Sequence, residues 1–294
     1  MSNFLNVLPD LVIAPSSKIG WRIRLLTAKL DGSLFYISWP DFLRLLVPSR
    51  LKSKDHSSTV GPVKKVREEG SLVLWNTPLG EFWGRDSDGA ALSFLLKEQL
   101  LGHAYQRGPV AVRSGDIVFD VGSHLGTFTR FALQSGARRV VAFEPESINI
   151  ACFKRTFQKE ILQGQVVLVE AAAWETPGIL TLGCADPNDH CASGKGSVVC
   201  LRSQKDAPSV SAVTIDDVAQ RLTLDRVDFL KLDIEGAERH AIRGGRHVIS
   251  HFRPRMAICI YHRPDDPTII PREVLDCRRD YQVFSDDLCQ AYFC

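Results

Sequence analysis

Short apolar runs alternate with segments of helical periodicity from Val110 onward. Each run is four to seven residues long and rich in Val, Ile, Leu and Phe, which is typical of a buried strand. The five expected strands are Ile117–Val121, Val140–Phe143, Val166–Val169, Val227–Asp233 and Met256–Tyr261. Strands that alternate with helices predict an α/β fold with a mainly parallel sheet and helices on both of its faces.

The segments between these strands predict the helices and loops of the same domain. Helices are expected over Thr127–Ser135, over Ile150–Ile161, where the apolar residues share one face, and over Ala237–Phe252. Ile179–Leu182 follows a Pro-Gly turn and predicts an added strand. Residues 183–209 are rich in Gly, Ser, Pro and Asp and predict a long loop.

The pattern before Val110 is different. Trp21–Leu30 and Phe35–Val47 mix apolar and charged positions and predict two helices, and the polar stretch Lys52–Thr59 predicts a linker. Two interpretations of the first 60 residues stay open: an amphipathic arm that binds a surface, or a helical cap over the core.

A hairpin and a helix are expected to lead into the α/β domain. Ser71–Trp75 and Gly80–Trp83 flank a turn, and Asp88 begins a helix that continues through Leu100. The predicted divisions are a helical N-terminal extension (1–60), a hairpin-and-helix segment (61–109) and the main domain (110–294).

Composition excludes several classes of protein. The chain has 294 residues, of which 45% are hydrophobic and 24% charged, as in ordinary globular proteins. Its 36 Lys and Arg against 34 Asp and Glu give no electrostatic reason to expect nucleic acid or an anionic membrane as a partner. The longest uncharged run, Gly70–Gly80, has 11 residues, too few for a transmembrane helix. The first residues lack the order of a secretory signal, so we expect a cytoplasmic location.

Eight cysteines invite a disulfide interpretation, which belongs to short secreted chains. No C-x-x-C pair is present, so a zinc knuckle is not favoured either. We expect most of the cysteines to be reduced thiols, with Cys152 and Cys259 packed in the core.

The expected chemistry lies where the parallel strands end, since ligands of open α/β sheets bind there. The first strand ends in the loop Asp120–Gly126, in which Gly122 allows a turn and close approach of a ligand, and Gly126 allows the next helix to pack closely. The second strand ends in Glu144-Pro145, and an acidic residue there can accept both hydroxyls of a ribose.

The sequence of this loop distinguishes between two kinds of nucleoside cofactor. A dinucleotide fingerprint has glycine in the position that His124 occupies, because a pyrophosphate needs the space. S-adenosylmethionine has no pyrophosphate, and its carboxylate can meet the N–H groups of the loop and helix N-terminus. A nicotinamide-dependent dehydrogenase is therefore disfavoured but stays an alternative, as does a non-catalytic nucleoside-binding protein.

Ionisable residues gather at the ends of the fourth and fifth strands. Strand alternation puts Lys231, Asp233 and Glu235 on one side, and His262 emerges beside Asp233. A histidine next to a carboxylate can take a proton near neutral pH, so His262 or Asp233 is the expected general base. Alternatively, a divalent metal such as Mg²⁺ on Asp233, Glu235 and also Asp265 would lower the pKa of a bound hydroxyl.

With these residues the sequence resembles the FkbM family of S-adenosylmethionine-dependent methyltransferases. The resemblance rests on Asp120–Gly126, Phe143–Pro145, Thr214–Asp217, Tyr261–Asp266 and, most specifically, Val227–Glu238, which reads VDFLKLDIEGAE. It implies a Rossmann-like class I methyltransferase fold and methyl transfer, often to a hydroxyl of a sugar or polyketide. Two features depart from the family: His124 stands where Asn is usual, and the ten residues after Phe284 leave room for a closing antiparallel strand that is short or absent.

The sequence therefore predicts an O-methyltransferase with a small-molecule or glycan acceptor; self-association is left open. The expected cofactor-binding residues are Asp120, Gly122, Ser123, His124, Gly126, Glu144, Pro145 and Ala172. The expected catalytic residues are His262, Asp233 and Lys231, and the metal ligands would be Asp233 and Glu235.

Overall fold

The computed structural model describes residues 18–46, 61–184, 196–197, 208–285 and 288–294. The chain divides into two compact units, Met1–Ser53 and Lys54–Cys294. None of the helices in the described ranges combines the length and the apolar character that a bilayer crossing requires. The predicted linker lies outside the described residues.

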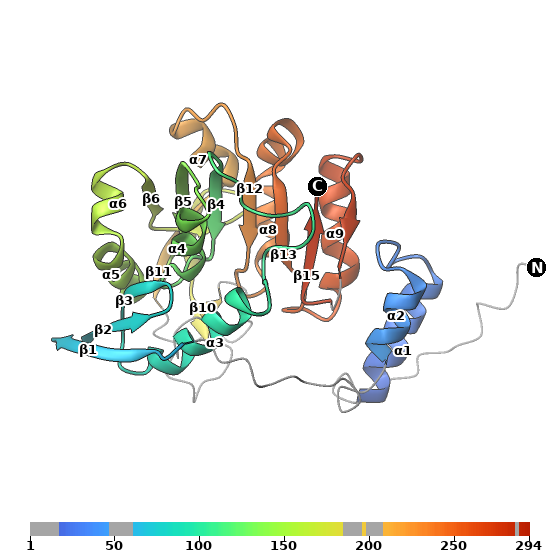
Figure 1. Ribbon diagram of the computed structural model, residues 1–294. Coiled ribbons are helices and arrows are strands. Elements are labelled where there is room, and N and C mark those ends of the chain that lie inside the picture. Colours follow the sequence, from blue (N-terminus) through green and yellow to red (C-terminus); the bar gives the residue numbers. More distant parts are fainter. Residues whose placement is uncertain (1–17, 47–60, 185–195, 198–207, 286–287) are drawn as a thin grey trace, which may run out of the picture. The chain divides into compact units, whose positions relative to one another are not determined.

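The first unit contains two helices, α1 (Lys18–Leu30) and α2 (Trp39–Leu46), as predicted (Figure 1). The second begins later than expected, because residues 31–36 form turns. Lys29 Nζ donates a hydrogen bond to the carbonyl oxygen of Leu34 at 3.0 Å and another to that of Ile37. These bonds tie the end of α1 to the turn that follows it.

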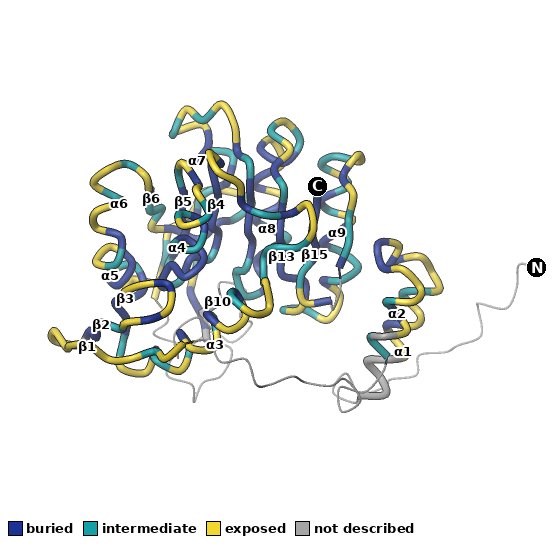
Figure 2. Tube along the Cα trace, viewed as in Figure 1, coloured by how far each residue is buried: buried dark blue, intermediate teal, exposed yellow. Residues whose placement is uncertain are grey.

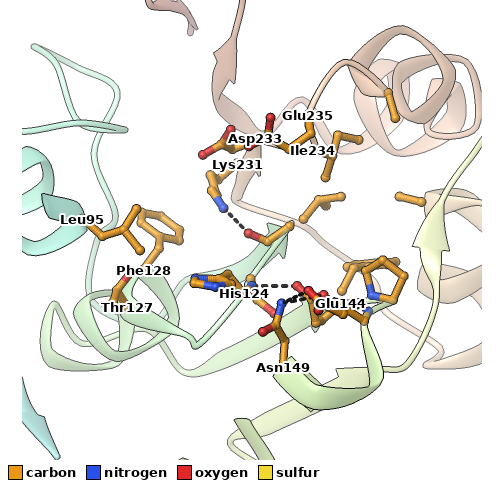
Figure 3. A pocket seen from close by; sticks show the side chains of 18 of the residues that line it. Leu95, His124, Thr127, Phe128, Glu144, Asn149, Lys231, Asp233, Ile234 and Glu235 are labelled. Atoms are coloured by element: carbon orange, nitrogen blue, oxygen red, sulfur yellow. Dashed lines mark hydrogen bonds between the residues drawn. The ribbon is translucent and has the colours of Figure 1, made fainter. Parts of the chain in front are cut away.

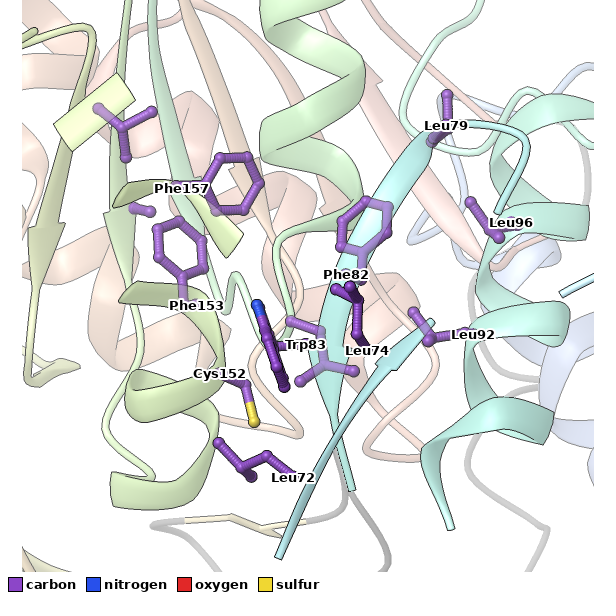
Figure 4. Close-up of a cluster of buried hydrophobic side chains, with 13 residues drawn as sticks. Leu72, Leu74, Leu79, Phe82, Trp83, Leu92, Leu96, Cys152, Phe153 and Phe157 are labelled. Atoms are coloured by element: carbon purple, nitrogen blue, oxygen red, sulfur yellow. The ribbon is translucent and has the colours of Figure 1, made fainter. Parts of the chain in front are cut away.

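The second unit opens with three antiparallel strands and a helix. They are β1 (Lys64–Glu69), β2 (Leu72–Thr77), β3 (Gly80–Gly84) and α3 (Asp88–Leu100). The hairpin of β2 and β3 and the helix confirm the prediction, whereas β1 was not predicted, because all six of its side chains are exposed. Phe82 and Leu92 from this segment pack with Phe153 and Phe157 in one apolar cluster (Figure 4).

A seven-stranded sheet forms the centre of the second unit, in the order β14-β15-β13-β12-β4-β5-β6. Its strands are β4 (Ile117–Val121), β5 (Arg139–Phe143), β6 (Val166–Val169), β12 (Phe229–Leu232), β13 (Arg255–Cys259), β14 (Val283–Phe284) and β15 (Gln290–Phe293). The five predicted strands are parallel neighbours. The closing antiparallel strand, expected to be short or absent, is present and short: β15 has four residues and pairs antiparallel with β13. This is the class I methyltransferase fold.

Helices and smaller strands connect these seven strands (Figure 1). The helices are α4 (Thr127–Gln134), α5 (Ser147–Thr156), α6 (Gln158–Leu162), α7 (Ile215–Arg221), α8 (Glu238–Arg243), the π-helical turn η2 (Val248–Phe252) and α9 (Asp266–Cys277). The strands are β7 (Ala172–Ala173), β8 (Gly178–Thr181), β9 (Gly183–Cys184), β10 (Gly196–Ser197) and β11 (Ser209–Val213). β7, β11 and β8 form a second sheet, and β9 pairs with β10, so the predicted loop contains short strands where it is described.

The helix predicted over Ala237–Phe252 is interrupted. It consists of α8 and η2, separated at Gly244 and Gly245. A Cβ atom on Gly244 would lie 2.0 Å from the carbonyl oxygen of Trp174, so this position requires glycine for close approach. The glycines that interrupt the helix therefore serve its packing.

Burial agrees with the predicted core (Figure 2). Val118 and Val140 pack with Phe128 and Ala132 of α4 on one side of the sheet. Cys152 and Cys259 are buried free thiols, as expected. Cys277 and Cys294 are also free thiols.

Candidate functional site

A cavity of about 360 Å³ opens where β4, β5 and β12 end, and α3 contributes to its wall (Figure 3). Most of the residues predicted to form the site line it: Gly122, Ser123, His124, Glu144, Pro145, Ala172, Lys231, Asp233 and Glu235. Many of the other lining residues are apolar, including Leu95, Phe128 and Phe143. A mostly apolar cavity with a few converging polar groups is the usual form of a small-molecule site.

Asp120 and Lys231 are paired across neighbouring strands, at the floor of the cavity. Their backbones are in register, and Lys231 Nζ lies 3.1 Å from Asp120 Oδ1 and 2.6 Å from the carbonyl oxygen of Gly122. Thr129 donates a hydrogen bond to the other Asp120 oxygen at 2.7 Å. Burial lowers the pKa of Lys231, but the charges of Asp120 and Asp233 outweigh it and raise this pKa. Lys231 is thus a cation that holds the loop in place.

The two predicted glycines have different neighbours from each other. Gly122 has φ +84°, and a Cβ atom there would lie 1.9 Å from the carbonyl oxygen of Asp233. The end of β12 therefore leaves no room for a side chain at this position, whether or not a ligand is bound. Gly126 has φ +87°, and its Cβ would lie 2.2 Å from the ring of Phe157, which confirms the predicted close packing of the helix.

The N–H groups of the loop, expected to meet a carboxylate, are largely occupied. Those of Gly122 and Ser123 donate to the carbonyl oxygen of Phe143 at 3.1 and 3.0 Å, and that of His124 donates to Glu144 Oε2 at 2.9 Å. Side chains of this loop, in contrast to its backbone N–H groups, provide polar atoms that can bind a ligand. Ser123 Oγ and His124 Nε2 are buried, line the cavity and have no hydrogen-bond partner among the described residues.

Glu144 is the central polar group at the end of β5. Its Oε1 accepts hydrogen bonds from the N–H of Glu146 at 2.9 Å and from Asn149 Nδ2 at 3.4 Å (Figure 3). Burial raises the pKa of Glu144 to about 7, against the opposing effect of these donors. Burial also lowers the pKa of His124 to about 4, so this imidazole is neutral at physiological pH.

Asp233 is the central polar group at the end of β12. The hydroxyl of Tyr105 donates a hydrogen bond to its Oδ2 at 2.5 Å. Burial raises the pKa of Asp233, but Lys231, His262 and the Tyr105 hydroxyl outweigh it, and the net pKa is lowered. Asp233 is therefore ionised at neutral pH.

His262 is surrounded by carboxylates. Its Nε2 lies 3.5 Å from Asp233 Oδ1 and 3.6 Å from Glu235 Oε2, and its Nδ1 lies 2.9 Å from Oε1 of the buried Glu238. Burial lowers the pKa of His262, yet the hydrogen bond and charge of Glu238, together with Asp233 and Glu235, raise it to about 9. The imidazole therefore carries a proton at neutral pH, which makes Asp233 the better proton acceptor of the two.

The residues considered as metal ligands do not all come together. Asp265 forms hydrogen bonds of 2.6 and 3.0 Å with the guanidinium of Arg239, so it is engaged elsewhere. Asp233, Glu238 and His262 bring three potential ligand atoms within 4.8 Å of one another. A cation bound here would contact Asp233, Glu238 and His262. The predicted set was Asp233, Glu235 and Asp265.

Sequence reasoning missed Tyr105, Asn149 and the contact of Glu238 with His262. Tyr105 lies 128 positions from Asp233, with φ +66° in a segment without periodicity, so no local signal pointed to it. Glu238 could have been found, since it belongs to the same motif as Asp233 and Glu235.

Comparisons with known proteins agree with this architecture. A family model described as the methyltransferase FkbM domain matches residues 120–283, more than half of the chain. The 31-O-demethyl-FK506 methyltransferase FkbM of Streptomyces tacrolimicus is 27% identical over 177 residues, which are 51% of this chain and 67% of that protein.

Two solved structures are similar to this chain at lower sequence identity. Methyltransferase FkbM from Methylobacillus flagellatus KT has a TM-score of 0.49 and 22% identity over 72% of this chain, which covers 56% of that protein. Fibrillarin from Aeropyrum pernix, solved with S-adenosyl-L-methionine natively bound, has a TM-score of 0.41 and 13% identity over 80% of this chain and 97% of its own. The family-model match, which runs from the end of β4 to the start of β14, decides the assignment: the chain belongs to the FkbM family of methyltransferases, which implies S-adenosylmethionine-dependent methylation.

Proposed function

We propose that the chain transfers the methyl group of S-adenosylmethionine to a hydroxyl of a small-molecule or glycan acceptor. One observation carries the proposal: three buried polar atoms line the same cavity and have no hydrogen-bond partner among the described residues. They are Ser123 Oγ, His124 Nε2 and Asn149 Oδ1. Buried polar groups are rarely left without a partner, so these atoms support a polar ligand beside Glu144.

The cofactor occupies the half of the cavity formed by the ends of β4 and β5. Glu144 accepts hydrogen bonds from the ribose hydroxyls, and Ser123 and His124 meet the methionine part. Because the imidazole of His124 is neutral, it does not repel the positive sulfonium. Pro145 and Ala172 complete the wall next to the nucleoside.

The acceptor occupies the half formed by Tyr105, Lys231 and Asp233. As the new O–CH₃ bond forms, the S–CH₃ bond breaks and S-adenosylhomocysteine leaves, while the hydroxyl proton passes to Asp233. Tyr105 orients this carboxylate, and Lys231 keeps it ionised. His262 contributes as a positive neighbour of Asp233.

The test is methyl transfer from S-adenosylmethionine carrying a radiolabelled methyl group to fractions of small metabolites and glycans. Label that withstands mild base indicates an ether product, as expected for a hydroxyl acceptor. Replacing Asp233 by Asn is expected to lower turnover by ~10²–10⁴-fold if a proton transfer is lost, with cofactor affinity nearly unchanged. Normal turnover in this variant, or base-labile label throughout, would contradict the proposal.

A divalent cation is a second candidate for activating the hydroxyl. Asp233, Glu238 and His262 offer three ligand atoms within 4.8 Å of one another, so a cation that displaces the proton of His262 would have nitrogen and carboxylate ligands. Calorimetric titration with Mg²⁺ and Mn²⁺ tests this candidate. Absence of binding, together with methyl transfer that survives a chelator, would leave Asp233 acting without metal.

We also propose a cytoplasmic location for this activity. The support comes from the thiols of Cys152, Cys259, Cys277 and Cys294, which are unpaired. Unpaired thiols are typical of a reducing compartment.

A further inference from the structure

Large apolar side chains are exposed at unusual density on the N-terminal helices. Among the described residues, twelve large hydrophobic side chains are exposed, and half of them belong to the short stretch 23–43. They are Ile23, Leu26, Leu30, Phe35, Trp39 and Leu43. Clustered exposure of this kind marks an interaction surface.

These side chains follow the helical repeat. Ile23, Leu26 and Leu30 are three and four positions apart and therefore share one face of α1. Trp39 and Leu43 are four positions apart and share one face of α2. Leu30, at 69% exposure, and Leu43, at 57%, are left open to solvent although the unit has an apolar interior of its own.

That interior shows that the exposed stripes are not needed to hold the helices together. Leu25, Leu34 and Phe42 are buried, and Lys29 fastens the end of α1 to the turn through the carbonyl oxygens of Leu34 and Ile37. The Lys29 ammonium also lies 5.3 Å from the centre of the Trp39 ring. The apolar stripes are thus available for something other than the contact between α1 and α2.

Charge is distributed unevenly between the two units of the chain. The first unit, residues 1–53, holds seven Lys or Arg and three Asp or Glu, whereas the rest holds 29 and 31. The overall charge of +2 therefore combines a basic N-terminal unit with a slightly acidic remainder. Arg22 and Arg24 directly flank Ile23 in the sequence of α1.

We propose that the α1–α2 unit is an interfacial anchor that binds an anionic lipid surface. Stripes of exposed leucine, isoleucine and tryptophan on helices that also contain lysine and arginine have the composition of helices that lie in the plane of a membrane interface. The basic excess favours anionic headgroups over neutral ones. Anchoring of this kind would hold the methyltransferase next to acceptors at the membrane, although no helix among the described residues could span it.

The test is co-sedimentation of the full chain with vesicles of phosphatidylcholine alone or mixed with phosphatidylserine. We expect binding to the mixed vesicles, with a blue shift of tryptophan fluorescence and weakening as NaCl rises from about 50 to about 500 mM. The double variant Leu26→Ser with Leu43→Ser is expected to bind about tenfold or more weakly, because two apolar contacts with the interface are lost. Arg22→Gln with Arg24→Gln is expected to lose binding to the anionic vesicles selectively.

A matched control removes exposed apolar side chains from the second unit. Leu162→Ser with Ile179→Ser changes residues that are 82% and 70% exposed, and it should bind vesicles like the wild type. Equal circular dichroism and S-adenosylmethionine affinity across the variants would exclude misfolding. Failure of the wild type to bind, or equal binding to neutral vesicles, overturns the proposal. A concentration-dependent dimer that Leu26→Ser with Leu43→Ser abolishes also overturns it, because a second copy would then cover the stripes.

Discussion

Two carboxylates at the ends of β5 and β12, which flank β4 in the sheet, have pKa values shifted in opposite directions. Burial raises the pKa of Glu144 to about 7, because its partners are N–H groups without full charge. Burial acts on Asp233 too, but Lys231 and His262 outweigh it and lower the pKa. At neutral pH Asp233 is therefore the more stable anion of the two, whereas Glu144 is close to its pKa and only partly ionised.

Replacing Glu144 by Gln is expected to change how stability depends on pH. The folded-state pKa of about 7 is above the ordinary value of 4.5, so the stability that protonated Glu144 contributes is present below pH 4.5 and is lost as pH rises through 7. Gln cannot lose it. The difference in unfolding free energy should therefore shift toward the variant by about 1–3 kcal/mol between about pH 5 and pH 8. Urea unfolding at both pH values measures it, and a constant difference would contradict the assigned pKa.

The charge on His262 depends on Glu238. We expect NMR titration of the wild type to find an imidazole with a pKa of about 9, and Glu238→Gln to return it toward 6.5. Because the folded-state pKa is raised, this histidine stabilises the fold below pH 6.5, and the contribution is lost as pH rises through 9. Glu175→Gln, which alters the carboxylate 3.4 Å from His240, is the control and should leave His262 unchanged. An imidazole already neutral at about pH 7.5 in the wild type would refute this account of the cluster.

At the scale of elements, one tight contact sets the spacing of the cavity. The turn after β4 meets the end of β12 at Gly122, where there is no room for a side chain. This contact brings the loop beside Asp233 and so joins the two halves of the proposed site. The energetic effect of this contact can be measured separately from the cost of the left-handed backbone conformation.

Gly122→Ala and Gly115→Ala form a matched pair for that purpose. Their φ angles are +84° and +85°, but a Cβ on Gly115 meets nothing within 4 Å, whereas one on Gly122 would lie 1.9 Å from the Asp233 oxygen. Gly115→Ala should cost about 1–2 kcal/mol of stability, the penalty of the left-handed conformation alone. Gly122→Ala should cost clearly more and weaken S-adenosylmethionine binding. Equal unfolding free energies of the two variants would show that the contact carries no weight.

Elements were predictable where a local pattern carried the information. The parallel strands β4, β5, β6, β12 and β13 are mostly apolar runs, as is typical of strands that are covered on both faces. β14 has two residues and β15 has four, too few for periodicity, and only their pairing beside β13 makes them strands. For the site, strand ends pointed to Glu144 and Asp233, whereas Tyr105 reaches Asp233 by a contact that sequence spacing does not encode.

At the scale of the whole molecule, the chain combines two units of different character. The larger unit has the fold and the cavity of a methyltransferase, and its charge is close to balanced. The smaller unit is basic and exposes apolar stripes. The sequence predicted both of its helices and its basic character, which the overall charge of +2 does not reveal because the larger unit offsets it.

The central claim is that the cavity beside Glu144 binds S-adenosylmethionine, and calorimetric titration of the full chain tests it most directly. We predict that S-adenosylmethionine binds and that NAD does not. Glu144→Gln should weaken S-adenosylmethionine binding by about 1–3 kcal/mol, or ~10–100-fold, through loss of charge-assisted hydrogen bonds. Glu170→Gln, a matched change at an exposed site after β6, should bind like the wild type. Binding of NAD in place of S-adenosylmethionine, or equal affinities for Glu144→Gln and the wild type, would contradict the account.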